Sequence, residues 1–488
     1  MKRGVAVAAL LAVSACGGGP GRPKAPLTGP VVSRVSTATD RSSIAVTVYN
    51  NNTGLVREVR NVDLGGGRVS LEFRDVSTEI EPNTVHVKSL ADGVFSVLEQ
   101  NYRYDLLTPE KLLEKSVGKT IRVYRMNKET GKEEAIDAEI LSTEDGVPVL
   151  RVGTEITYGI PGRFGFSELP ANLIAKPSLV WLLESEAAKP QVEVSYLSGG
   201  LNWEADYVLS VGEEAGDTGV AKADLIGWVT LTNQTGTSYE HAKLKLVAGD
   251  VQRVRPPADA PVMLDELKSE ADDSGGSGFK EEGFFEYHLY SLQRPTDLLA
   301  SETKQVTLLE GHGLDVKRRL VFVGNTSYFR GQYGQIATNQ KVGVFLELQN
   351  SEANHMGMPL PKGTIRVYKA DKGGMKQFIG EDRIDHTPRD EKITVKMGES
   401  FDIVGDRKQT DYDVLDTCTT ETAWEISLRN HKDKPDEVIV REPVGSDWTL
   451  VQSSQTSTKE DAHTLAFLAK IPARGQTKIT YRIRVKWC

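Results

Sequence analysis

The sequence lacks the features of several common protein classes. Its 488 residues contain no run of 18 apolar residues, so no transmembrane helix is predicted. Only three cysteines are present, which excludes a densely disulfide-stapled scaffold. The chain has 59 Lys and Arg against 68 Asp and Glu, and a net charge of −9 argues against a nucleic-acid partner. Aromatic residues make up 7%, whereas 45 glycines and 21 prolines indicate many short strands and turns.

The N-terminus has the features of an export signal. Residues 1–3 are basic, residues 4–13 are apolar, and small residues lead to Cys16. The apolar run is too short to span a bilayer. The order Val13-Ser14-Ala15-Cys16 resembles the lipobox of bacterial lipoproteins, which implies cleavage after Ala15 and lipidation of Cys16. The alternative is an ordinary signal peptide with an incidental cysteine.

Residues 16–30 are rich in glycine and proline, and we expect a flexible tether that links the lipid to the folded chain. The mature protein would then be anchored to the bacterial cell envelope, at the outer membrane or in the periplasm. The acyl chains would insert into the membrane and hold the protein there.

Alternation of apolar and polar residues dominates the rest of the chain, for example over 43–49, 192–196, 225–231 and 342–348. This pattern predicts a mainly β fold of tandem, immunoglobulin-like β-sandwich modules. One short helix is expected from Thr108, which can cap it, to Val117 before Gly118. The short strands that follow suggest a small SH3-like barrel.

Four modules are predicted from the turn clusters and composition. They span residues 31–185, 186–340, 341–408 and 409–488, and the last of them has the strand spacing of an immunoglobulin-like domain. Residues 256–283, within the second module, contain eight acidic and two basic residues and predict an acidic loop.

Cys418 and Cys488 could form a disulfide, because an exported protein lies in an oxidising compartment. Alternation along residues 478–487 turns Ile479 and Tyr481 inward and leaves Cys488 on the outward side, which argues against the bridge. Two free thiols remain the alternative.

Seven blocks of sequence form a recognisable set: NYRYDLL (101–107), LLEKSVG (112–118), GGLNWEADY (199–207), NQTG (233–236), LVAGD (246–250), PLPKGTIRVY (359–368) and GEDRIDHTP (380–388). Together they resemble a group of exported bacterial proteins classed only as a domain of unknown function. The later half more loosely resembles mucoidy inhibitors, a name that hints at envelope polysaccharide. The resemblance implies a β-sandwich fold and an exported setting, and it supplies no activity.

Motifs for catalysis and cofactor binding are absent. The eight histidines never fall within four residues of one another, and there is no phosphate-binding loop, dinucleotide fingerprint, nucleophile elbow or Cys-x-x-Cys motif. We therefore predict no cofactor, no local metal site and no catalytic residue, although ligands distant in sequence can still converge.

Two acidic clusters are candidate catalytic or cation-binding sites. Glu381, Asp382, Asp385 and His386 could serve acid–base chemistry or hold a cation, or they could form a polar turn. Asp411, Asp413 and Asp416 resemble part of a calcium loop but lack its glycine and closing glutamate.

An aromatic cluster is the third candidate. Trp203 and Tyr207, with Trp228 across the sheet, predict a core in which Asp206 or Asn233 satisfies a polar atom, and an exposed sugar platform is the alternative.

Two functions follow from these observations. The first is a non-enzymatic envelope lipoprotein that binds or scaffolds, with a protein or polysaccharide partner. The second is an envelope hydrolase in which carboxylates such as Asp206, Asp382 and Asp385 meet in a cleft.

Overall fold

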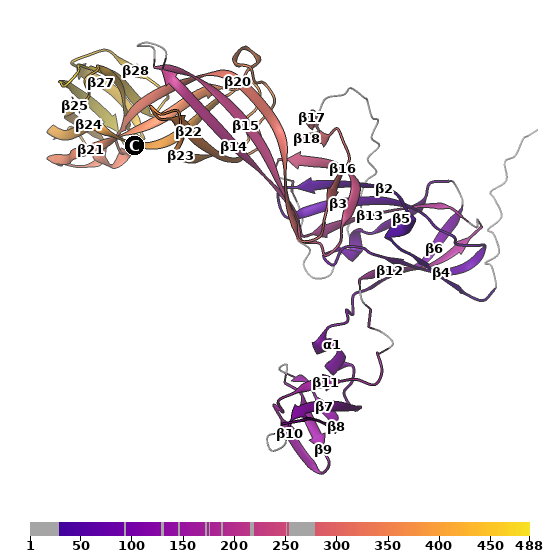
Figure 1. The fold of residues 1–488 in the computed structure, drawn as a ribbon. Coiled ribbons are helices and arrows are strands. Elements are labelled where there is room, and N and C mark those ends of the chain that lie inside the picture. The colour runs from indigo at the N-terminus through magenta and orange to yellow at the C-terminus, as the bar shows by residue number, and fades with distance from the viewer. Residues whose placement is uncertain are drawn as a thin grey trace, which may run out of the picture.

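The computed structural model describes residues 29–91, 94–127, 131–144, 147–170, 173–174, 176–186, 189–214, 219–249, 251–252 and 279–488. This part of the chain is mainly β, with several sheets and one α-helix (Figure 1), so the predicted mainly β, β-sandwich class is confirmed. The predicted signal peptide, Cys16 and most of the tether lie outside the described residues. Among the residues described, no helix has the length and apolarity needed to cross a bilayer.

The first sandwich packs a four-stranded sheet on an eight-stranded sheet. The four-stranded sheet has the order β1 (Val32–Ser36), β4 (Gly67–Arg74), β12 (Ser178–Ser185), β6 (Phe95–Arg103). The other runs β17 (Phe279–Phe284), β18 (Tyr287–Leu292), β16 (Tyr239–Ala248), β2 (Arg41–Tyr49), β3 (Thr53–Asn61), β13 (Gln191–Gly199), β5 (His86–Ser89), and β19 (Thr296–Leu298) pairs with β16. Short 3-10 helices at Ala38–Asp40 and Pro82–Thr84 connect some of these strands.

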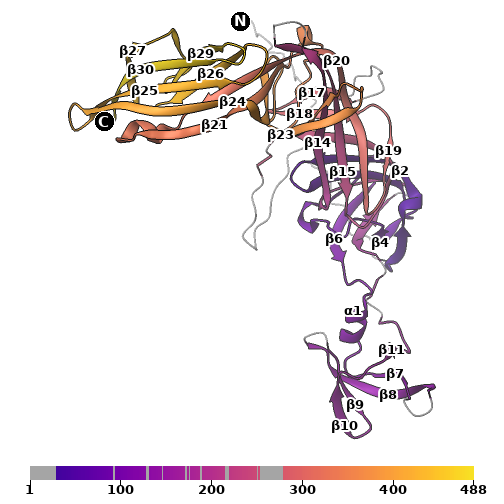
Figure 2. The same ribbon diagram turned by 60° about the vertical axis from the view of Figure 1, so that its left-hand side comes forward.

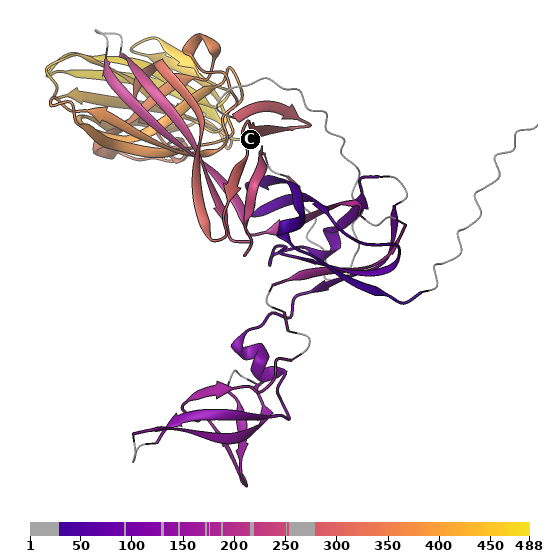
Figure 3. The same cartoon turned by 45° about the vertical axis from the view of Figure 1, so that its right-hand side comes forward.

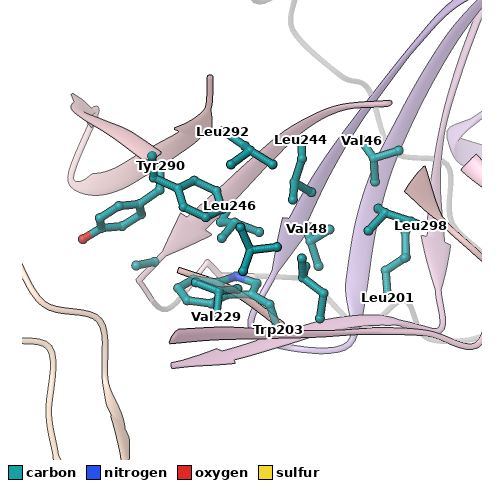
Figure 4. Close-up of a cluster of buried hydrophobic side chains, with 14 of the residues drawn as sticks. Val46, Val48, Leu201, Trp203, Val229, Leu244, Leu246, Tyr290, Leu292 and Leu298 are labelled. Carbon is teal, nitrogen blue, oxygen red and sulfur yellow. The ribbon is translucent and has the colours of Figure 1, made fainter. Parts of the chain in front are cut away.

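Alternating apolar residues fill the space between these sheets. The rings of Phe73 and Trp181 meet edge to face with centroids 5.6 Å apart. Figure 4 shows how the core continues beyond the sandwich, because Trp203 packs beside side chains of the eight-stranded sheet, Val48 and Leu246 among them. The first sandwich and the start of the next sheet therefore share one hydrophobic core.

A thirteen-stranded sheet forms most of the remaining body. Its main path is β23 (Lys376–Ile384), β22 (Gly363–Ala370), β14 (Leu201–Glu214), β15 (Val220–Asn233), β20 (Glu302–Val323), β21 (Gln335–Gln349), β24 (Lys392–Val414), β25 (Thr419–Asn430), β30 (Gln476–Lys486), β27 (Asp447–Ser453). Strands β26 (Asp436–Pro443), β28 (Ser457–Lys459) and β29 (Thr464–Ile471) branch from it, and 3-10 helices lie at Thr326–Arg330 and Glu352–Asn354.

The first seven strands of this sheet curl round an apolar interior. β23 comes against β24, where the backbone N–H of Lys396 donates to Asp382 Oδ2 over 2.7 Å. No backbone ladder joins these two strands among the described residues, so the curl stays open.

The predicted module boundaries need correction. Residues 31–185 and 186–340 do not form separate sandwiches, because β13 pairs with β3 and β16 pairs in parallel with β2. The boundaries at 341 and 409 fall inside β21 and β24. These strands are 15 and 23 residues long. The turn-type residues within them, Asn339, Gly343 and Gly398, lie at irregularities of the pairing where each strand continues, so local pattern could not show the true extent of the strands. The predicted acidic loop lies outside the described residues up to 278, and its last five residues begin β17.

The C-terminal sandwich has its own core. Trp424, Ile426, Val440 and Phe467 are all buried there, as are Leu320 and Phe322 from β20. The sandwich therefore begins well before residue 409. In this sandwich, the apolar side chains that alternate along each strand pack against those of the neighbouring strands.

A disulfide joins Cys418 and Cys488, whose Cα atoms are 5.4 Å apart. β30 ends at Lys486, and the backbone N–H of Trp487 donates to the carbonyl of Cys418 over 2.8 Å. The objection from strand alternation fails because Cys488 lies beyond the end of the strand.

A separate lobe contains the helix and a small sheet, and it stands apart from the main body in all three ribbon views (Figures 1, 2 and 3). Helix α1 (Pro109–Glu114) begins as predicted, with Thr108 Oγ1 accepting from the backbone N–H of Lys111, but it ends before Val117. The sheet order is β10 (Glu155–Tyr158), β9 (Val149–Val152), β8 (Glu133–Ser142), β7 (Thr120–Met126), β11 (Arg163–Gly165). The sheet does not close into the suggested SH3-like barrel. In the described residues β10 and β11 lie at its two edges and do not pair with each other, so the sheet is open.

Each sandwich contains one fully buried arginine–glutamate pair. In the first, Arg60 Nη2 lies 3.0 Å from Glu58 Oε1, with side chains 0% and 1% exposed. In the second, Arg407 Nη2 lies 2.6 Å from Glu442 Oε1, and the Tyr481 hydroxyl donates to Glu442 Oε2 over 3.1 Å. The Arg407 guanidinium also lies over the ring of Phe322. Burial of this kind is tolerated only while the charges stay matched.

Five buried tyrosines predict an alkaline limit to stability. Burial raises the pKa of Tyr239 to about 12 and raises those of Tyr196, Tyr207, Tyr290 and Tyr481 further above their usual value. The folded state holds these protons more tightly than the unfolded state, so this contribution is complete below about pH 10 and is lost as pH rises beyond it. We expect tyrosinate absorbance to show a late group that ionises only as near-ultraviolet circular dichroism is lost. Ionisation of all 15 tyrosines near pH 10 in a still-folded chain would contradict this.

Candidate functional site

The solvent side of four neighbouring strands, β23, β22, β14 and β15, carries the most chemically varied surface of the curled sheet, and we call it the outer face. Alternation along the strands places on it these residues: Phe378, Glu381 and Arg383 of β23; Thr364, Arg366 and Tyr368 of β22; Asp206, Val208 and Ser210 of β14; and Asp224, Ile226, Trp228 and Thr230 of β15. Their neighbours in sequence, such as Leu209, Leu225 and Val367, point into the core. The outer face is therefore the polar half of an alternating pattern, with aromatic residues added.

Arg366 forms the centre of the outer face. Its Nη1 donates to Asp206 Oδ1 over 2.9 Å, and its Nε lies 3.2 Å from Glu381 Oε2. The hydrogen bond that Arg366 donates to Asp206 is the main reason that the pKa of Arg366 is raised above its usual value. The Thr230 hydroxyl donates to the other oxygen of Asp206 over 2.9 Å, so contacts fix this carboxylate from two sides.

Aromatic rings flank this charged centre. The rings of Tyr368 and Phe378 meet edge to face with centroids 5.7 Å apart, and Phe378 is 55% exposed. Trp228 lies opposite Asp206 on the neighbouring strand and is partly exposed. From Trp228 to Tyr368 the separation is two strands and four residues, about 16 Å between Cα atoms at ordinary strand spacing. The outer face thus has two aromatic ends, and Arg366, Val208 and Ile226 lie side by side between them.

The predicted cluster at 381–386 does not converge. Glu381 lies on the outer face, whereas Asp382 pairs with Ile365 in register and accepts from β24 on the opposite side. His386 Nδ1 accepts from the backbone N–H of Lys362 over 3.2 Å, and the Asp385 carbonyl accepts from Thr387. The polar-turn interpretation fits these contacts, because each group binds a different part of the fold.

The carboxylates named for a hydrolase are likewise dispersed. Asp206 lies on the outer face, Asp382 on the reverse side, and Asp385 follows the end of β23.

The three aspartates that resemble part of a calcium loop bind protein groups instead. Asp411 and Asp413 both contact Arg482, and Asp416 Oδ1 accepts from the backbone N–H of Cys418 over 2.8 Å. In the described ranges no group of three or more His, Cys, Asp or Glu residues has the geometry of a metal site.

No protein-family model and no curated protein sequence matches this chain. Function must therefore be argued from the geometry.

The aromatic cluster predicted from sequence divides between two environments. Trp203 and Tyr207 are buried as expected, but Trp203 Nε1 donates to the carbonyl of Val247 over 3.3 Å and the Tyr207 hydroxyl to that of Pro361 over 2.7 Å. Neither Asp206 nor Asn233 is the partner, and Asn233 instead donates to the backbone carbonyls of Thr237, Leu298 and Leu299.

Trp228 was wrongly placed in that core. Its position is one residue out of step with the buried Leu225, Val229 and Leu231, so it faces solvent. The parity of the strand could have shown this from sequence. Tyr368, Phe378 and Arg366 were missed because nothing local reveals that β22 joins β14 in parallel.

The reverse side of the same strands ends in an apolar hollow of about 780 Å³, including its open mouth. It is lined by Val211, Val316, Val344, Leu346, Ile379 and Met397, with Glu214, Arg318, Lys369 and Glu399 among the remaining residues. Arg318 Nε donates to Glu214 over 2.7 Å and its two terminal nitrogens lie 3.3 Å from Asp436. A bulge in β23 separates the two environments, so that Phe378 faces outward while the adjacent Ile379 lines the hollow.

Proposed function

We propose that the protein is a non-enzymatic, lipid-anchored binding or scaffolding protein of the bacterial cell envelope, and that it holds its partner on the outer face. The observation that supports this most directly is the combination of an exposed Phe378 ring, partly exposed Trp228 and Tyr368 rings and fixed charged groups on one side of a sheet. Binding sites carried on strands lose little entropy when a partner docks, because the side chains are already positioned.

The arrangement of carboxylates favours binding over hydrolysis. A glycosidase needs two carboxyl groups about 5 to 10 Å apart with the scissile bond between them. On the outer face, Arg366 lies between Asp206 and Glu381 and contacts both. The space that a scissile bond would need is thus taken by a guanidinium group.

The envelope location is proposed from the sequence around Cys16, together with the resemblance to exported proteins of unknown function. A diacylated and N-acylated cysteine would hold the chain at the membrane, since each buried methylene contributes about 0.8 kcal/mol. The tether would leave the sheets free to reach a partner.

Co-sedimentation with isolated envelopes tests this proposal. The chain from residue 17 onward, which has no lipid, is expected to sediment with the envelopes, and the double variant Trp228→Ala/Phe378→Ala to remain largely in the supernatant. Phe401→Ala serves as the matched control, because Phe401 is 86% exposed and lies outside the outer face. In cells, Cys16→Ser should move the full chain from the membrane to the soluble exported fraction. Release of new reducing ends from envelope polysaccharide, or unchanged sedimentation of the double variant, would contradict the proposal.

A further inference from the structure

We propose that the partner of the outer face is an uncharged polysaccharide, bound as an extended chain from Trp228 to the Tyr368–Phe378 pair. This inference rests on the proposed binding function and specifies its ligand class. The same groups could in principle contact a protein, a polyanion or a membrane surface, and three features of the outer face favour the neutral glycan.

The first feature is the charge of the outer face. Arg366 is shared between Asp206 and Glu381, and on the neighbouring strand Asp224 lies 3.5 Å from His312 and accepts from the backbone N–H of Gly313. A polyanion or an anionic bilayer is held by clustered cations that are free of such partners. The charged residues of the outer face are instead Asp206, Asp224, Glu381, Arg366 and Arg383, so carboxylates outnumber guanidinium groups and the two arginines form no cluster of cations, which disfavours an anionic ligand.

The second feature is the pair of aromatic ends. The hydrogen-bearing faces of pyranose rings are apolar and pack on aromatic rings, whose faces carry partial negative charge. Trp228 and Tyr368 lie about 16 Å apart, a distance that a single sugar ring does not span and a chain of sugars does. The Phe378 ring, 55% exposed, extends the second end to the edge strand β23.

The third feature is a set of polar groups around the rings, in which Arg366 and Asp206 lie between Trp228 and Tyr368, whereas Thr230 and Gln305 lie on the far side of Trp228. Asp206, Thr230 and Gln305 form a linked row, since Gln305 Nε2 donates to Thr230 Oγ1 over 3.1 Å and Thr230 donates to Asp206. Carboxylate and hydroxyl oxygens keep further lone pairs for donors, and guanidinium has five N–H groups. A hydroxyl-rich ligand can use both. Protein interfaces are instead depleted of charged residues at their centre.

The experiment measures binding of the chain from residue 17 onward to an array of neutral α- and β-linked hexose oligosaccharides, with alginate as the anionic polymer and phosphatidylglycerol vesicles as the anionic surface. We expect binding to at least one neutral series, with affinity that rises with chain length and changes little between low and high sodium chloride. Phe378→Ala and Trp228→Ala should each weaken this binding about tenfold, the effect of losing one aromatic contact. Ile379→Ala is the matched control, because it removes the adjacent apolar side chain from the hollow and should leave affinity within about twofold.

Each other outcome has a defined meaning. Failure to bind any neutral oligosaccharide overturns the glycan inference, and envelope co-sedimentation that still depends on Trp228 and Phe378 would then leave the binding function standing with a protein partner. Binding only to alginate or to vesicles, lost in high salt, overturns it in favour of an anionic ligand. Neutral-glycan binding that is equally strong in Phe378→Ala, Trp228→Ala and Ile379→Ala overturns the assignment to the outer face.

Discussion

Replacing Arg407 by methionine is expected to lower the free energy of unfolding by about 3 to 5 kcal/mol, because it leaves the Glu442 carboxylate buried without its cation. Arg407 and Glu442 are 0% and 1% exposed, so water cannot take the place of the lost partner. Chemical denaturation followed by the fluorescence of the buried Trp424, which belongs to the same core, gives the measurement.

Companion variants separate the loss of a partner from the loss of volume. In Arg407→Met/Glu442→Leu/Tyr481→Phe the whole polar group is replaced by apolar side chains of similar size, and most of the stability should return. Surface variant Arg441→Met, which removes an exposed contact to Glu460, should cost less than about 1 kcal/mol. An Arg407→Met chain as stable as this control would show that the buried pair is not required.

Replacing Gly363 by valine is expected to cost about 3 kcal/mol and to detach the β22–β23 hairpin from β14. A Cβ atom at this position would lie 2.1 Å from the carbonyl oxygen of Ala205 and 2.8 Å from its carbonyl carbon. Both are backbone atoms, so no change of rotamer can relieve the clash. Hydrogen exchange should speed up at the β22 and β14 amides, and neutral-glycan binding should fall with it because Tyr368, Phe378 and Arg366 would move away from Trp228.

Gly283→Val is the control for this variant. Nothing lies within 4 Å of the position a Cβ atom would take at Gly283, and the residue is also in a strand. Its stability and hydrogen exchange should remain close to those of the unsubstituted chain. Equal protection of the β22 amides in both variants would contradict the expected effect at Gly363.

Much of the fold could be predicted because period-two alternation depends only on residues within one strand. The strand at 225–231, the cap at Thr108 and the inward residues of the last strand all follow from local rules. Pairing between distant segments does not. β16 joins β2 in parallel across about 200 residues of sequence, and no local signal indicates that partner.

The candidate site shows the same division. Asp206 and Glu381 were singled out from sequence, yet their common partner Arg366 comes from a third strand, to which the sequence assigned no role in a site. The parity of Trp228 was available in the sequence and was overlooked, whereas the meeting of Trp228, Tyr368 and Phe378 on one side required the sheet order.

Strands β20 and β24, of 22 and 23 residues, each begin in the curled sheet and end in the C-terminal sandwich. β21 runs through the same region in the opposite direction, so three continuous strands cross the junction, where a linker would have given a hinge. A load applied to a ligand on one side would reach the disulfide-closed end along these continuous strands. The junction would then bend less freely than a linker and would hold the outer face and the C-terminal sandwich at a set spacing.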